Sequence, residues 1–127
     1  MTTGEIGALG EKLAAKYFKK NGYKILERNR HQSHNEIDLI VSDRNYLVFV
    51  EVKTRTTASE DLYLPFGSPA AAVDRKKQLR TIRAAQDYMR TCPAKGKQPR
   101  MDVVEIYLDR ETGKLRKLNH IPDAFGA

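Results

Sequence analysis

Residues 36–53 carry the pattern that most constrains how this chain can fold. Two runs rich in β-branched and aromatic residues lie on either side of a short polar segment, which predicts two antiparallel strands joined by a hairpin. In the second run, Leu47 and Phe49 alternate with a row of valines, so both faces of that strand are apolar. A strand of this kind belongs inside a sheet that is covered by helices on both sides.

Acidic residues interrupt these otherwise apolar strands. If Arg44 and Asn45 form a two-residue loop, the register that follows places Asp38 opposite Glu51. Directly opposed residues share a face, with Cβ atoms about 4.5–5.5 Å apart, which is close enough for two carboxylates to hold one cation. Strict alternation also puts Glu36, Asp38 and Ile40 on one face, and Glu51 and Lys53 on one face of the second strand.

Length and composition predict one folded domain, residues 1–127. The chain is 40% hydrophobic and 31% charged, has no apolar run long enough to span a membrane and begins without a signal-peptide pattern, so we expect a cytoplasmic protein without a membrane partner. Cys92 is the only cysteine, which excludes an internal disulfide framework and a thiolate zinc cluster. The net charge of +7 favours polyanionic partners, nucleic acid first.

Outside the hairpin, the first helix is the clearest element. Thr2 and Glu5 have the spacing of a capping box, and Asn21-Gly22 is typical of a helix end, so a helix is predicted from Thr2 to about Lys20. Its predicted buried stripe is Ile6, Leu9, Leu13 and Tyr17. Glu11 lies at the border of that stripe, where it is either an ordinary boundary glutamate or a functional acid.

The remaining elements are a strand over residues 23–30, a helix from about Pro69 to Arg90, and strands over residues 101–108 and 114–120. The helix is predicted to bury Ala72, Leu79, Ile82 and Met89. Ser68-Pro69 has the form of an N-cap followed by a first-turn proline. The segment before it, from Thr54 to Ser68, has little periodicity and is a candidate substrate flap.

This second helix carries a dense group of basic residues. Such a group is either a solvated helix face or a surface that contacts phosphates, and the pattern favours neither. The residues that we consider for contact with nucleic acid are Arg55, Arg75, Lys76, Lys77, Arg80 and Arg83.

Two opposed carboxylates repel each other, so a half-buried face keeps them when a positive group compensates. Mg²⁺ or Mn²⁺ would do so at Asp38 and Glu51, and a metal with a nearby amine at Lys53 suits phosphodiester hydrolysis. The alternative is that Asp38, Glu51 and Lys53 lie on an exposed face and form weak charge pairs. The apolar residues Leu47 and Phe49 share the face of Glu51, which is unusual for an exposed face and argues against that alternative.

Several motifs give the chain a specific resemblance. It resembles the YraN family of uncharacterised bacterial proteins and, more distantly, archaeal Holliday-junction resolvases and other PD-(D/E)xK nucleases of the restriction-endonuclease-like fold. The segments that carry the resemblance include Gly10-Glu11, Arg28-Asn29, Glu36-Ile37-Asp38, Val50-Glu51-Val52-Lys53, Phe66-Gly67, Arg100-Met101-Asp102 and His120-Ile121-Pro122. One departure is Asn35, which stands where the family usually has glycine; we interpret it as a residue that tolerates positive φ.

The resemblance implies an α/β domain with a central mixed sheet flanked by helices. It also implies a Mg²⁺-dependent (or Mn²⁺-dependent) nuclease acting on DNA, branched or otherwise structured forms included, with metal at Asp38 and Glu51, the motif lysine at Lys53 and a first-helix glutamate at Glu11. By analogy to resolvases, which cut paired strands, it implies a homodimer. Two other hypotheses remain: an accessory module that binds nucleic acid without cleaving it, and a structural protein in which these acids only pair with Lys53 and Arg55.

Overall fold

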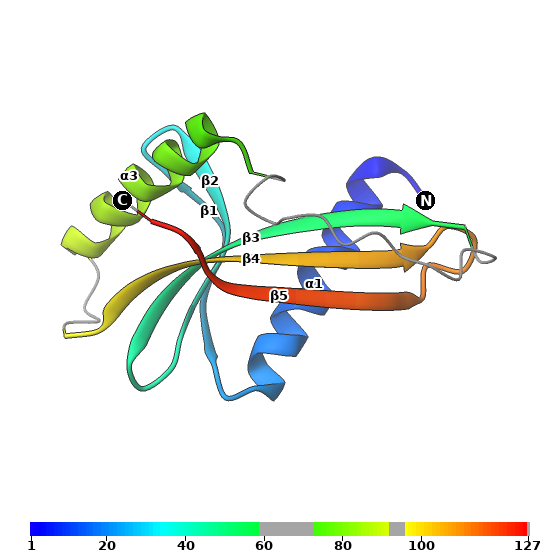
Figure 1. The fold of residues 1–127 in the computed structure, drawn as a ribbon, viewed down its shortest axis with the longest axis horizontal. Coiled ribbons are helices and arrows are strands. Elements are labelled where there is room, and N and C mark those ends of the chain that lie inside the picture. The colour runs from blue at the N-terminus through cyan, green and yellow to red at the C-terminus, as the bar shows by residue number, and fades with distance from the viewer. Residues whose placement is uncertain (59–72, 92–95, 127) are drawn as a thin grey trace.

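A mixed five-stranded sheet forms the centre of the protein, in the order β1-β2-β3-β4-β5 (Figure 1). The computed structural model describes residues 1–58, 73–91 and 96–126. Neighbouring strands are antiparallel except β3 and β4, which are parallel. The elements are α1 (Thr3–Lys20), β1 (Lys24–Gln32), β2 (Asn35–Ser42), β3 (Tyr46–Thr57), α3 (Arg75–Thr91), β4 (Gln98–Asp109) and β5 (Leu115–Phe125).

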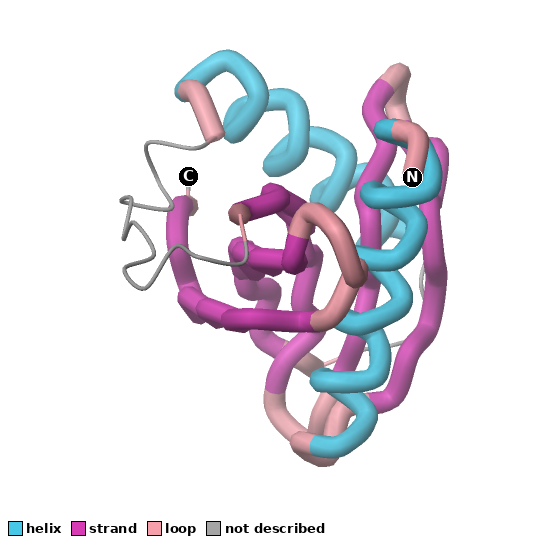
Figure 2. The backbone as a smooth tube through the Cα atoms, turned by 90° about the vertical axis from the view of Figure 1, so that its right-hand side faces the viewer, coloured by secondary structure: helices cyan, strands magenta, loops and turns pink. Residues whose placement is uncertain are grey.

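Both faces of the sheet are covered, as the apolar pattern of β3 predicts. Val48 and Val50 belong to a core cluster with residues of α1, whereas Leu47 and Phe49 belong to a second cluster with residues of α3. Figure 2 shows the two helices running in different directions over the twisted sheet. The α/β class and the helix-flanked mixed sheet are therefore confirmed, and this architecture is consistent with the restriction-endonuclease-like fold.

Helix α1 begins and ends as predicted. The Thr2 side chain accepts a hydrogen bond from the Glu5 backbone, the Glu5 carboxylate accepts one from the Thr2 backbone, and Asn21 closes the other end. The centre of its buried face is rotated from the predicted stripe, whose members are only partly buried. The buried residues are Gly10, Ala14, Ala15 and Phe18.

Small size at Gly10 lets α1 approach β3 closely. A Cβ atom built on Gly10 would lie 2.8 Å from Cβ and 2.9 Å from Cγ2 of Thr54, nearer than side chains pack. Glu11 follows directly, so the same close contact brings its carboxylate to the sheet. The approach of helix to strand therefore depends on the absence of a side chain at this position.

The structure corrects several predicted boundaries. Strands β1 and β5 are longer than predicted, and a tight turn at Ser33 and His34 joins β1 to β2. Helix α3 begins at Arg75, not Pro69, because Asp74 caps it: the Asp74 carboxylate accepts from the Lys77 backbone N–H at 2.7 Å. Leu79, predicted to be buried, is 51% exposed.

Some predictions fall on parts of the chain that the structure does not describe. The Ser68-Pro69 cap, Ala72, Cys92 and most of the proposed flap, residues 59–68, lie outside the described residues. Within the described ranges, neither helix is long and apolar enough to cross a membrane.

Replacing Gly10 with alanine should destabilise the protein. Alanine favours an isolated helix by up to about 1 kcal/mol, but the clash with Thr54 is an overpacking defect that costs about 1–3 kcal/mol. We expect a net loss in the free energy of unfolding, measured by urea denaturation. Gly7→Ala is the matched control, because a Cβ there meets no atom within 4 Å. Equal stability of the two variants would contradict the close-contact account.

Candidate functional site

Asp38 lies where the ladder between β2 and β3 opens. The ladder pairs Leu39 with Val50 and continues to Ser42 with Leu47, which is the register predicted from the Arg44-Asn45 loop. One further step in this register would oppose Asp38 to Glu51. Instead, the Asp38 carboxylate accepts a hydrogen bond from the Val52 backbone N–H at 2.8 Å. The acid side chain thus takes the place of a backbone partner at the end of the ladder.

The face on which Asp38 lies differs from the predicted one. Ile37 and Ile40 both pack in the α3-side cluster, although residues three apart in a regular strand point to opposite faces. Alternation is therefore broken between them, opposite Asn29 of β1, whose φ is +49°. Asp38 consequently lines two hollows on the α1 side together with Glu11, and does not share the face of Ile40.

Three carboxylates influence one another at this point. Burial is the largest cause that raises the pKa of Asp38, to about 7, and the charges of Glu51 and Glu11 raise it further, while the Val52 N–H and Lys77 oppose the rise. Burial also raises the pKa of Glu11, helped by the charges of Glu36 and Glu51. The charges of Glu51 and Glu11 thus act on Asp38, and the charge of Lys77 opposes them.

Glu36 joins this group through Asn29. With its amide nitrogen turned toward the acids, Asn29 donates to both Glu11 oxygens at 2.9 and 3.2 Å and to Glu36 at 3.0 Å. His31 lies 3.7 Å from the other oxygen of Glu36. Asn29 is a site residue that the sequence analysis did not identify. The available signal was an asparagine, which tolerates positive φ, inside a strand.

Lys53 lies beside Glu51, as predicted. Its ammonium is 3.6 Å from the Glu51 carboxylate, whose side chain is 11% exposed. Arg55, two residues further on the same strand face, is instead directed to the buried Glu105, with Nε 4.0 Å from the carboxylate. Contact between Arg55 and nucleic acid therefore stays a prediction, and the structure gives this arginine an internal partner.

The basic residues of α3 divide into two groups. Arg75, Lys76, Arg80 and Arg83 are exposed along the helix. Lys77 is partly buried and turns toward the sheet, where its ammonium donates to the side-chain oxygen of Asn35 at 2.9 Å. The helix thus offers an exposed basic surface and one cation directed toward β2.

The donor set suits a hard divalent cation that keeps several waters. Among the described residues, no three His, Cys, Asp or Glu side chains converge to form a preformed metal cage. Mg²⁺ commonly binds through one or two carboxylates with water completing its octahedron. Asp38 and Glu51 fit that mode, with Glu11 and Glu36 as nearby acids.

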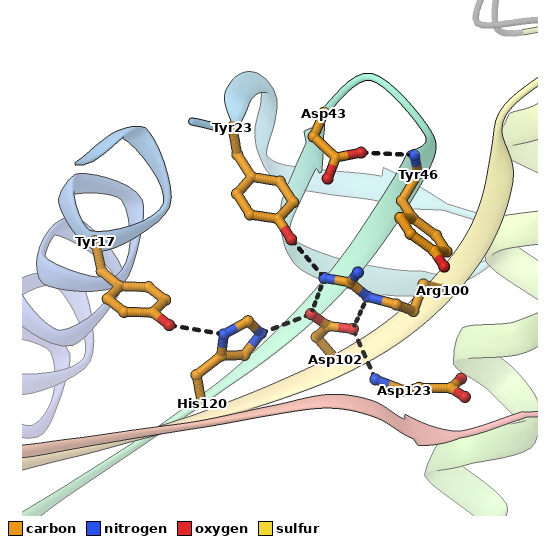
Figure 3. Close-up of polar contacts among 8 residues, drawn as sticks. All are labelled: Tyr17, Tyr23, Asp43, Tyr46, Arg100, Asp102, His120 and Asp123. Atoms are coloured by element: carbon orange, nitrogen blue, oxygen red, sulfur yellow. Dashed lines mark hydrogen bonds and ion pairs between the residues drawn. The ribbon is translucent and has the colours of Figure 1, made fainter. Parts of the chain in front are cut away.

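A second polar cluster, shown in Figure 3, joins the C-terminal half of α1 to β4 and β5. The buried Asp102 accepts from Arg100 at 2.8 Å and from the Asp123 backbone at 3.0 Å, and its carboxylate is 2.7 Å from Nε2 of His120. Burial raises the pKa of Asp102, but these hydrogen bonds outweigh burial and lower it overall.

Aromatic rings complete this cluster. Tyr17 Oη lies 2.9 Å from Nδ1 of His120, and the Arg100 guanidinium lies 4.7 Å from the ring centroid of Tyr46 and donates to the hydroxyl of Tyr23. Every buried polar side-chain atom in the described residues has a partner. A fully satisfied network of this kind ties elements together, so we assign it a structural role and keep the Asp38 cluster as the candidate site.

Replacing Asp38 with asparagine should stabilise the protein above neutral pH. The pKa of Asp38 is about 7 in the folded protein, against 3.8 for an ordinary aspartate. The contribution of Asp38 to the free energy of unfolding is therefore fully present below about pH 4 and is lost as pH rises through 7. Asparagine carries no such charge. At pH 8 the free energy of unfolding of the variant should exceed that of the wild type by about 1–3 kcal/mol, and at pH 3.5 the two should be equal.

Urea denaturation across this pH range provides the measurement. Glu111→Gln, at an exposed turn, serves as the control and should follow the wild type at every pH. An Asp38→Asn variant that is less stable than the wild type at pH 8 would show that the negative charge of Asp38 does not destabilise the folded protein.

Comparison with known proteins confirms the family that the motifs indicate. The model of the uncharacterised protein family UPF0102 matches residues 10–106. A UPF0102 protein of Caldanaerobacter subterraneus is 48% identical over 120 residues, covering 94% of this chain and 93% of its own. UPF0102 proteins of Syntrophomonas wolfei (44% identical, 95% and 97% covered) and Dictyoglomus thermophilum (39% identical, 98% and 100% covered) are also similar. The chain belongs to the UPF0102 family, which is the YraN family.

Proposed function

We propose that this protein is a metal-dependent nuclease that hydrolyses phosphodiester bonds in DNA. The observation that carries the proposal is Asp38 at the open end of the β2–β3 ladder, where burial and then repulsion from Glu51 raise its pKa to about 7. A divalent cation is the ligand that would relieve this repulsion.

In the proposed site, Asp38 and Glu51 bind Mg²⁺ or Mn²⁺. The bound metal would polarise the scissile phosphate and lower the pKa of an attacking water. Lys53, 3.6 Å from Glu51, donates hydrogen bonds to the charge that develops on the phosphate oxygens. Glu11 supplies a further carboxylate from α1, whose pKa is raised by burial and by the charges of Glu36 and Glu51.

DNA is proposed as the partner because of charge. The chain carries a net charge of +7, and the exposed cations of α3 can contact phosphates that flank the site. We extend the proposal to branched or otherwise structured DNA and to a homodimer, since two centres are needed to cut paired strands, and to the cytoplasm as the compartment. The alternative, an accessory module that binds nucleic acid without cleaving it, would use the same basic surface.

Asp38→Ala should abolish DNA cleavage by the purified protein. The assay offers single-stranded, duplex, flap and four-way-junction DNA with Mg²⁺ or Mn²⁺, and the fastest substrate should lose at least about 100-fold in rate, because loss of a metal ligand costs more than loss of an outer-shell partner. Glu111→Ala controls for removal of an exposed carboxylate and should cleave normally.

Two outcomes would contradict the proposal. Cleavage that persists in Asp38→Ala would show that the activity does not come from this site. Salt-sensitive DNA binding by the wild type, with no cleavage of any DNA form and no divalent-ion binding that depends on Glu51, would support the accessory module instead.

A further inference from the structure

Asn35 makes an unexpected connection between the sheet and α3. Its side chain is 7% exposed, and its amide nitrogen donates to Thr81 Oγ1 at 3.3 Å. Its oxygen accepts from the Lys77 ammonium at 2.9 Å, and the Thr81 hydroxyl donates to the Lys77 backbone carbonyl at 3.0 Å. These bonds close a ring that fixes the Lys77 side chain against the first residue of β2.

The backbone does not explain why asparagine occupies this position. The left-handed residues of the β1–β2 turn are Ser33 (φ +51°) and His34 (φ +61°), and Asn35 is not among the residues with positive φ. The interpretation of Asn35 as a substitute for glycine's backbone freedom is therefore wrong. What asparagine supplies here, and glycine cannot, is the side-chain oxygen that holds Lys77.

The Lys77 ammonium is held on the strand that carries Asp38. Asn35 and Asp38 both belong to β2, and Asn35 precedes Asp38 by three residues, roughly 10 Å along the strand. Lys53 lies beside Glu51 on the neighbouring strand, β3. The two ammonium groups near the proposed site therefore come from different elements, α3 and β3.

An ammonium held by a neutral amide oxygen remains able to bind an anion. Lysine carries three N–H donors, and Asn35 takes one of them. Because amide oxygen brings no negative charge, the cation is oriented without being neutralised, unlike Arg55 beside Glu105. A compact, oriented point charge of this kind is a common protein ligand for phosphate.

We propose that Lys77 binds a phosphate of the DNA strand next to the Asp38–Glu51 pair, and that Asn35 is the positioning residue that holds its ammonium there. The inference rests on the proposed nuclease function and gives Lys77 a part that its exposed neighbours on α3 do not share. Those neighbours contribute affinity, whereas Lys77 fixes the strand relative to the carboxylates.

The test compares Lys77→Met, Asn35→Gly and the double variant with Lys114→Met, an exposed lysine between β4 and β5 to which no part in binding is assigned. Single-turnover cleavage and DNA affinity are measured with the DNA form that the wild type cleaves fastest, in Mn²⁺. Lys77→Met should cleave at least about 10-fold more slowly, since small misplacements of a reacting group can cost 100-fold, with DNA affinity changed less than about threefold. Lys114→Met should cleave at the wild-type rate.

Asn35→Gly should also slow cleavage, and the double variant should be no slower than Lys77→Met, because residues that act as one unit are not additive. Mn²⁺ affinity, measured by calorimetry, should be unchanged or higher in Lys77→Met, because a cation near Asp38 has been removed; a merely structural defect would lower it.

Wild-type cleavage rates in Lys77→Met, additive effects in the double variant, or weakened Mn²⁺ binding would overturn this inference. Asp38→Ala, assayed in parallel, distinguishes a failure of the inference about Lys77 from a failure of the proposed nuclease function. If Asp38→Ala is inactive while Lys77→Met is fully active, the inference about Lys77 fails alone. If the wild type cleaves no DNA form, or Asp38→Ala remains active, the proposed function fails and the inference fails with it.

Discussion

Electrostatic repulsion among buried or half-buried carboxylates is the constraint on which the rest of this structure depends. Asp38, Glu51 and Glu11 come from a strand, its neighbour and a helix; the charge of Glu51 raises the pKa of both Asp38 and Glu11, and the charge of Glu11 raises that of Asp38. Such an arrangement costs stability unless something positive compensates. The protein supplies part of that compensation through Lys53 and Lys77, and a divalent cation would supply the remainder.

The fold maintains this arrangement through contacts outside the acid cluster. Gly10 allows α1 to lie against Thr54 of β3, which brings Glu11 to the sheet. The Asp102 network fixes the other half of α1 to β4 and β5 through His120 and Tyr17. Apolar clusters on both faces of the sheet keep these acids from moving apart. The proposed catalytic site would need preorganisation of this kind.

Local chemistry determines the features that the sequence predicts well. The β2–β3 register follows from the turn at Arg44 and Asn45, and the limits of α1 follow from the Thr2–Glu5 capping box. Two features are harder to predict from the sequence: which distant residue a side chain contacts, and where a strand breaks its alternation. Both depend on partners that are distant in the sequence. The face of Asp38 depends on the irregular pairing opposite Asn29, and the function of Asn35 depends on α3 packing above it. Leu79 is exposed because α3 is oriented by Thr81, Ile82 and Tyr88, and helical periodicity alone could not select that face.

The central claim is that Asp38 and Glu51 share one divalent cation. A crystal of the protein soaked in Mn²⁺ and measured near the manganese absorption edge tests it directly, because anomalous scattering locates the ion without reference to the protein density. We expect an anomalous peak within about 2–2.5 Å of carboxylate oxygens from both residues. An absence of a peak between Asp38 and Glu51, at a Mn²⁺ concentration that saturates the protein in solution, would contradict the account.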